Sequence, residues 1–120
     1  TWCGPCVASI PHMNELAERF GDRASFVAVS NEGGEQFRVG LERIGRGVED
    51  FGASLALDPA GRMAGAAGLQ GIPHLLVMSR DGIVRWQGHP RDLDEDLLGA
   101  IIDADAASAA GAVGAVESAG

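Results

Sequence analysis

The strongest constraint on the fold of this chain is a pair of cysteines at the head of an amphipathic segment. Cys3 and Cys6 are the two cysteines of the sequence, and apolar residues recur after them at steps of three and four. That spacing predicts a helix over residues 3–20 with one buried face. A Cys-x-x-Cys pair in the first turn of a helix places its first sulfur beside unpaired N–H groups, which stabilise a thiolate.

The chemistry of this motif follows from the positions of its members. Cys3 is the expected attacking thiol because it meets the positive end of the helix, and Cys6, one turn further in, is the expected resolving thiol. Gly4 and Pro5 set the tightness of the turn, and the ring of Trp2 offers a flat apolar contact beside the sulfurs. We therefore predict a redox-active cysteine pair that needs no separate cofactor.

Two other interpretations of the cysteine pair stay open beside redox chemistry. The pair could be half of a zinc site, but a closed structural site needs four ligands and no second Cys-x-x-Cys follows. It could also be a static disulfide, although a disulfide stabilises most when it closes a long loop and this loop is minimal. Redox chemistry is favoured over both, and no bound metal is expected.

Short apolar runs alternate with helical segments along the middle of the chain. Strands are expected over residues 25–30, buried on both faces, and 54–58, and helical spacing marks residues 37–48. Asp58 predicts the N-cap of a further short helix, which Gly68 ends. This alternation predicts an α/β fold.

The last third of the chain carries a hairpin, a helix and a biased tail. The Asp-Gly pair at residues 81–82 joins two apolar runs and predicts a tight antiparallel hairpin. Residues 92–95 resemble a capping box, and an apolar helical face follows them. Alanine and glycine without periodicity then predict a disordered tail over residues 105–120, after a single domain over residues 1–104.

Charge and hydropathy narrow the expected partners. The formal net charge is −8, and no arginine stripe could follow a phosphate backbone, so nucleic acid is not an expected partner. No apolar run approaches the roughly 18 residues of a spanning helix. We expect no membrane contact from this chain itself.

These residues resemble the thioredoxin superfamily. The match rests on "WCGPC" at residues 2–6, on Pro11 five residues after the second cysteine, and on "GIPHLLVMSRDGIVRWQGHP" at residues 71–90. Within the superfamily the chain is similar to the TlpA/ResA-like thiol-disulfide oxidoreductases over residues 1–104. The resemblance implies a thioredoxin-like α/β fold with a central mixed sheet flanked by helices.

The resemblance also implies a substrate-binding surface. Ile72 and Pro73 would form a cis-proline loop that lies against the cysteine motif and pairs its backbone with an extended substrate segment. Trp2, Gly4 and Pro5 would complete this surface. Protein thiols and disulfides are the implied partners.

One position and one segment depart from the family pattern. Many TlpA-like relatives carry a Glu three residues after the second cysteine, where this chain has Ser9. In the family a central strand feeds the cysteine helix and lies between the strands expected here at residues 25–30 and 75–79. We expect this N-terminal strand to be missing, which leaves two apolar strand edges unpaired and the chain unstable or prone to aggregation.

A function and a location are implied as well. The implied activity is disulfide exchange with protein substrates, and the CGPC sequence resembles that of reducing members, which need an upstream electron donor. Family members mostly face the bacterial cell envelope. The resemblance therefore implies that compartment, with any membrane anchor in the missing N-terminal portion.

The three histidines suggest one alternative function. His12 is expected on the solvated side of the first helix and His89 in a loop, whereas His74 follows the expected cis-proline and could approach the cysteines. There it could tune the Cys3 thiolate or, with Cys3 and Cys6, bind Cu(I) as in a copper chaperone. Sco-type chaperones resemble this arrangement but space their cysteines one residue wider. A peroxidase is less favoured, because its reactive cysteine would need a different local motif.

Overall fold

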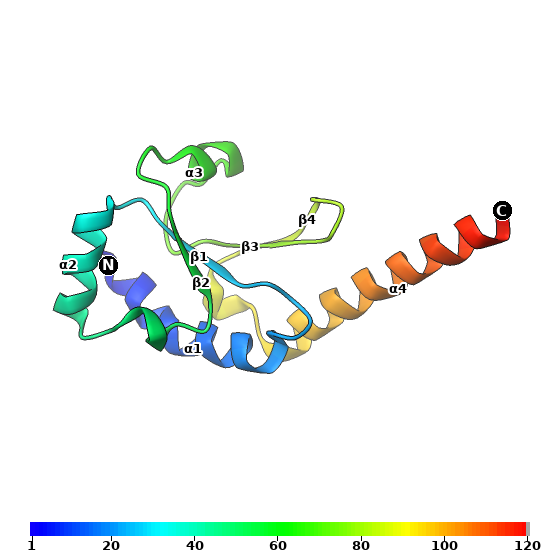
Figure 1. The fold of residues 1–120 in the computed structure, drawn as a ribbon, viewed down its shortest axis with the longest axis horizontal. Helices are drawn as coiled ribbons and strands as arrows, with labels where there is room; N and C mark the ends of the chain where they lie inside the picture. The colour runs from blue at the N-terminus through cyan, green and yellow to red at the C-terminus, as the bar shows by residue number, and fades with distance from the viewer. Residues whose placement is uncertain (120) are drawn as a thin grey trace.

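The expected alternation of helices and short strands is present along the chain (Figure 1). The computed structural model describes the backbone of residues 1–119 and the side chains of residues 1–108. The elements, in order, are α1 (Gly4–Phe20), β1 (Val27–Ser30), α2 (Gly34–Ile44), the 3-10 turn η1 (Val48–Asp50), β2 (Ser54–Leu57), α3 (Arg62–Ala67), β3 (Leu75–Met78), β4 (Val84–Gly88), the 3-10 turn η2 (Pro90–Asp92) and α4 (Glu95–Ala119).

The strands form two separate pairs. β1 and β2 are parallel, with Val27 opposite Ser54, and β3 and β4 are antiparallel, with Leu75 opposite Gly88. The presence of both parallel and antiparallel strand pairs agrees with a thioredoxin-like α/β fold. The central mixed sheet that we expected is divided into two two-stranded sheets, because no strand among the described residues bridges β1 and β3.

Strand β1 is more open than its apolar sequence predicts. Val27 and Val29 point to the same face of the strand and are 58% and 42% exposed. Ala28 and Ser30, on the opposite face, are half-buried. The expectation of burial on both faces is wrong, because within the described residues no element covers the valine face.

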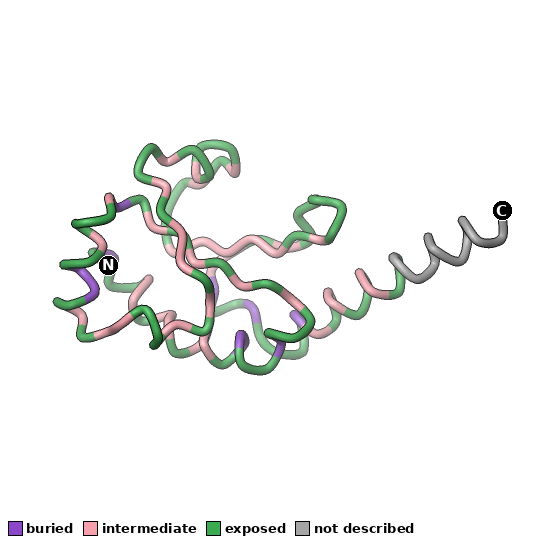
Figure 2. Tube along the Cα trace, in the orientation of Figure 1, coloured by how far each residue is buried: buried purple, intermediate pink, exposed green. Residues whose placement is uncertain are grey.

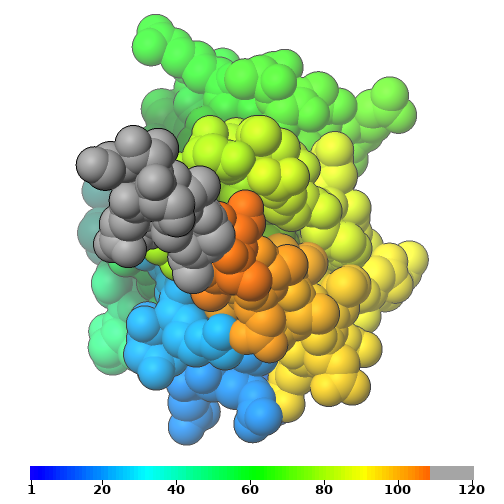
Figure 3. All heavy atoms as spheres, turned by 90° about the vertical axis from the view of Figure 1, so that its right-hand side faces the viewer, coloured from blue at the N-terminus to red at the C-terminus, as the bar shows by residue number. Residues whose placement is uncertain are grey.

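The hydrophobic core lies at the C-terminal end of α1. Leu16 and Phe20 pack there against Leu93 and Leu98, and these four side chains are the buried apolar cluster. Figure 3 shows the first turns of α4 between the β3–β4 hairpin and the segment that follows α1. Partly buried residues complete the cluster: Met13, Phe26, Leu75, Val77, Trp86, Ile101 and Ile102.

Helix α3 begins later than its sequence suggests. The carboxylate of Asp58 accepts hydrogen bonds from the N–H groups of Arg62 and Met63, at 3.1 and 2.8 Å. Asp58 therefore caps the helix from four residues ahead of it, because a turn with Gly61 at φ 66° intervenes. Gly68, at φ 67°, ends the helix in the left-handed conformation that glycine adopts without strain.

The hairpin is present, but its loop is wider than a two-residue turn. The loop runs from Ser79 to Ile83, and Gly82 alone takes a positive φ, 82°. Asp81 instead accepts hydrogen bonds from the Ser79 hydroxyl and the Ile83 N–H. These bonds accompany a loop that is longer than the tight turn expected from the Asp-Gly pair.

The N-terminal cap of helix α4 lies two residues later than expected. Asp92 lies in η2, and the cap is Asp94, whose side chain accepts a 2.8 Å hydrogen bond from the Leu97 N–H. The backbone of the helix is described as far as Ala119. The disordered tail over residues 105–120 and the domain boundary after residue 104 stay predictions, and residue 120 lies outside the described residues. Among the described helices, none combines the length and hydropathy needed to cross a bilayer.

Candidate functional site

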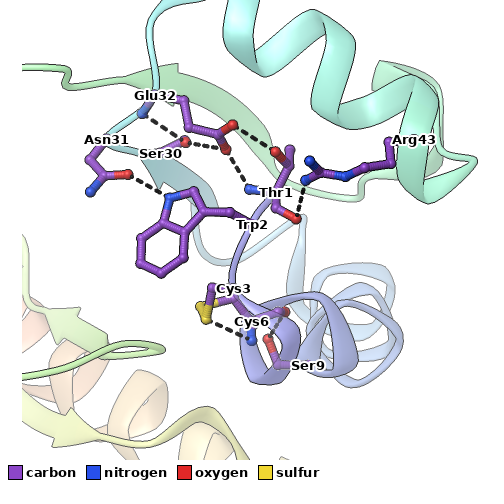
Figure 4. The surroundings of a disulfide bond; sticks show 9 residues. All are labelled: Thr1, Trp2, Cys3, Cys6, Ser9, Ser30, Asn31, Glu32 and Arg43. Atoms are coloured by element: carbon purple, nitrogen blue, oxygen red, sulfur yellow. Dashed lines mark hydrogen bonds and ion pairs between the residues drawn. A yellow bond between two sulfur atoms is a disulfide. The ribbon is translucent and has the colours of Figure 1, made fainter.

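The cysteine pair lies at the start of α1, as its sequence predicts. Cys3 is the N-cap residue, and its Sγ accepts a hydrogen bond from the Cys6 N–H at 3.2 Å (Figure 4). The two residues form a disulfide, with their Cα atoms 5.2 Å apart. Pro5 occupies the first turn, where its missing N–H leaves no hydrogen bond unmade. A reduced Cys3 would therefore place its thiolate against a backbone N–H and the positive end of the helix.

Residues Thr1 and Trp2, directly ahead of the motif, are held by side chains from α2 and the loop before it. We call these contacts the Thr1–Trp2 anchor. The Glu32 carboxylate accepts hydrogen bonds from the amino group of Thr1 and, at 2.6 Å, from its hydroxyl. The guanidinium of Arg43 donates to the Thr1 carbonyl at 3.1 Å, and the Asn31 carbonyl oxygen accepts from the indole of Trp2 at 3.3 Å (Figure 4).

Glu32 is the ionic centre of this anchor. Its side chain is 3% exposed, and among the residues whose burial is described no other charged residue is buried. Burial raises the pKa of Glu32, but hydrogen bonds from the Thr1 amino group and from the hydroxyls of Thr1 and Ser30 outweigh this effect and lower it. Glu32 is therefore ionised at neutral pH.

Thr1 is also fixed sterically. Its side chain packs on Gly40 of α2, where a Cβ atom would collide with the Thr1 hydroxyl and Cβ. Only glycine leaves room for this approach at residue 40. The segment ahead of Cys3 is thus positioned by a polar contact and by a close backbone contact.

Trp2 combines this positioning with exposure. The side chain is 58% exposed, although its indole N–H is bonded to Asn31. Figure 4 shows the indole ring of Trp2, the residue before Cys3, close to the disulfide. The structure therefore presents a flat apolar surface next to the reactive pair.

The structure places the other expected site residues on the strand β3 side of the molecule. The peptide bond between Ile72 and Pro73 is cis, as the resemblance implies, and Ile72 is 46% exposed. The imidazole Nε2 of His74 lies 3.0 Å from the side-chain oxygen of Gln87, on the neighbouring strand β4. His74 is therefore hydrogen-bonded across the hairpin, and its tuning of Cys3 stays a prediction.

The donor set for a metal carrier is not assembled. Within the part of the chain that the structure describes, no three His, Cys, Asp or Glu side chains lie close enough together to hold a metal ion. Cys3, Cys6 and His74 do not converge, and the two sulfurs are bonded to each other. No structural observation thus favours the copper chaperone.

A groove runs along α1 beside the motif. The imidazole of His12 is half-buried, with Nε2 2.7 Å from the Leu93 carbonyl oxygen, so the expectation of a solvated side chain is wrong. This contact arises because the chain after η2 passes against α1, which also brings the β4–η2 loop to the helix. The groove has a volume of about 450 Å³ and is lined by Pro5, Ala8, Ser9, His12, His89 and Arg91.

The fold and the site together define a thioredoxin-like protein with a disulfide in the first turn of its helix α1. No protein-family model matches the chain, and no curated protein matches it by sequence. Among solved structures it is similar to a protein from Chlorobium tepidum whose provisional description is thiol:disulfide interchange protein DsbE. The two are 29% identical, with a TM-score of 0.64 over 87% of this chain and 73% of that chain. The chain belongs to the thioredoxin superfamily.

Proposed function

We propose that this chain reduces disulfides in protein substrates through Cys3 and Cys6. The observation that carries the proposal is the Cys3–Cys6 disulfide at the N-terminus of α1, with the Cys3 sulfur in the capping position. Similarity to a protein described as a thiol:disulfide interchange protein supports disulfide exchange as the reaction. The CGPC sequence supports the reducing direction.

The reaction begins from the dithiol form. The Cys3 thiolate attacks one sulfur of a substrate disulfide, so that a Cys3–substrate bond forms, the substrate bond breaks, and the other sulfur leaves and takes up a proton. The Cys6 thiolate then attacks the Cys3 sulfur and releases the second substrate thiol. Two electrons have passed to the substrate, and the chain holds the disulfide seen in the structure. A dithiol electron donor returns the pair to its starting form by the reverse steps.

The substrate contacts the surface around the cysteines. Trp2 supplies an exposed apolar face beside them, and Gly4 and Pro5 keep the turn between the cysteines tight. Ile72 and Pro73 complete the surface in this proposal, since the half-exposed side chain of Ile72 offers a second apolar contact.

Resolution by Cys6 differs from that of relatives with an acid at residue 9. The Ser9 hydroxyl donates to the Cys6 carbonyl at 2.6 Å, so it does not act on the Cys6 thiol. We infer that solvent takes the proton of this half-buried thiol. Within the superfamily, we place the chain with the TlpA/ResA-like proteins of the cell envelope, in keeping with the DsbE similarity.

A thiol-disulfide titration in defined redox buffers tests the proposal. Alkylation followed by mass spectrometry should report a reversible two-electron couple, with Cys3 alkylated in preference to Cys6 near neutral pH. The same chain unfolded in urea is the control, because its two thiols should react alike. Two equally slow thiols in the folded chain would contradict the proposal.

A further inference from the structure

The groove along α1 begins inside the cysteine motif and leads away from it. Pro5, Ala8, Ser9 and His12 form one wall, and they follow the helical spacing that places residues on one face. His89, directly before η2, and Arg91, within η2, form the opposite wall. A substrate segment that extends from the attacked sulfur along this face would enter the groove.

The wall of the groove that faces α1 carries hydrogen-bond donors. The Arg91 side chain is 75% exposed, and its ion pair with Asp92, at 3.9 Å between exposed groups, is weak. The Nδ1 of His89 accepts a hydrogen bond from the Arg91 N–H at 3.1 Å. Neutral His89 therefore carries its proton on Nε2 and offers a second donor beside the guanidinium.

The local charge determines which ligand groups this wall of the groove attracts. Arg91 is the one formally charged residue among those that line the groove, within a chain of net charge −8. Charges beyond about 8 Å are screened at physiological ionic strength, so a ligand in direct contact with the guanidinium of Arg91 is affected mainly by that group, with which Asp92 is only weakly paired. A carboxylate can form an ion pair with the guanidinium, whereas an amide or an ammonium group cannot.

The length of the groove limits how far that carboxylate can lie from the substrate cysteine. Seven helical residues separate Pro5 from His12, which corresponds to about 10 Å. An extended peptide covers the same distance in about three residues. We propose that the groove binds the segment next to the reactive cysteine of a protein substrate, and that Arg91 recognises an Asp or Glu within about three residues of that cysteine. This inference rests on the proposed function and names its substrate class.

Matched disulfide peptides test the inference. Each has the form X-Gly-Gly-Cys-Gly-Gly-X in disulfide with a small neutral thiol, and X is Glu, Gln or Lys. The dithiol form of the chain should reduce the Glu peptide with a kcat/KM about two- to fivefold above that of the Gln peptide, the size expected for one exposed ion pair. Arg91→Glu should invert the order and favour the Lys peptide.

Arg62→Glu is the matched control, because it changes net charge equally at an exposed residue of α3 outside the groove. It should keep the wild-type order of peptides. An order that Arg91→Glu leaves unchanged, or that Arg62→Glu inverts equally well, overturns the inference while reduction itself upholds the proposed function.

A binding measurement separates the two proposals if no peptide is reduced. Analogues of the Glu, Gln and Lys peptides that carry serine in place of cysteine cannot undergo disulfide exchange. With a fluorescent label, their anisotropy measures binding to the groove alone. Tighter binding of the Glu analogue that Arg91→Glu reverses supports the groove even where exchange fails. Equal binding of all three analogues contradicts it.

Discussion

The two ends of α1 are held by different forces. At the C-terminal end, Leu16 and Phe20 are buried against Leu93 and other apolar side chains, and the buried segments in Figure 2 gather mostly there. At the N-terminal end, the hydrogen bonds of the Thr1–Trp2 anchor position the two residues ahead of Cys3, while Trp2 stays exposed. Apolar packing is non-directional and supplies most of the stability, whereas hydrogen bonds are directional and orient the reactive groups. Substitutions at the two ends should therefore affect different measurements.

The largest effect is expected from Cys3→Ser at the N-terminal end. Disulfide exchange should fall by a factor of about 1000 or more, because the attacking thiolate is removed. The free energy of unfolding should stay within about 1 kcal/mol of that of the reduced wild type. Stopped-flow exchange and urea unfolding under reducing conditions measure the two quantities, and a parallel loss of stability would remove the contrast between the two ends.

Leu16→Ala should show the opposite pattern. Leu16 is fully buried, so its truncation should lower the free energy of unfolding by about 2–5 kcal/mol. The preference for alkylation of Cys3 over Cys6 should persist in the molecules that stay folded. Leu97→Ala is the control, because Leu97 is 36% exposed and should lose clearly less stability in the same urea titration.

Glu32→Gln should have an intermediate effect that depends on pH. The lowered pKa of Glu32 means that the ionised carboxylate stabilises the fold above its ordinary pKa of about 4.3, and that this stabilisation is lost as the pH falls below it. At pH 7 the substitution should reduce the free energy of unfolding by about 1–3 kcal/mol. The gap between wild type and variant should narrow at pH 3.5 in parallel unfolding curves.

If the difference in the free energy of unfolding between wild type and Glu32→Gln does not change with pH, the charge of Glu32 does not contribute to stability. Glu35→Gln is the matched control. The pKa of Glu35 is also lowered, by its hydrogen bond with Arg38, but this side chain is exposed. Glu35→Gln should therefore reduce the free energy of unfolding at pH 7 clearly less than Glu32→Gln does.

The smallest effect is expected from Asn31→Ala. Loss of the 3.3 Å bond to the Trp2 indole should raise the KM for a protein disulfide about twofold at nearly constant kcat, because the ring is less well oriented. Trp2→Phe removes the same bond, so the effects of the two substitutions should not add in a double-mutant cycle. Gln36→Ala, at an exposed residue of α2, is the control. If the effects of Asn31→Ala and Trp2→Phe on KM add fully, Asn31 does not act through the Trp2 indole.

The sequence predicted what depends on neighbours along the chain. Helical spacing after Cys3 located α1 to within one residue of its start, and Gly68 marked the end of α3. The exposure of Val27 was not predictable, because it depends on which strands lie beside β1. The position of His12 was missed for the same reason, since its partner is Leu93.

The site was predicted in its chemistry and not in its supports. The cysteine spacing indicated the reactive pair, but no local pattern connects Thr1 with Glu32 or Arg43. A carboxylate two residues after a strand was a signal for Glu32, although it did not identify the partner. The place of Arg91 in the groove likewise depends on η2, which meets α1 only in the folded chain.

The Thr1–Trp2 anchor also bears on the order of folding. Its contacts join residues that are 29 to 42 positions apart in the chain, whereas the hydrogen bonds of α1 join residues four apart. Local contacts form faster than contacts that close long loops, so α1 can form before Trp2 is in place. We expect the cysteine pair to reach its final surroundings only after α2 has docked. A nascent or partly unfolded chain would then expose two ordinary thiols, and selective reactivity would appear only with the completed fold.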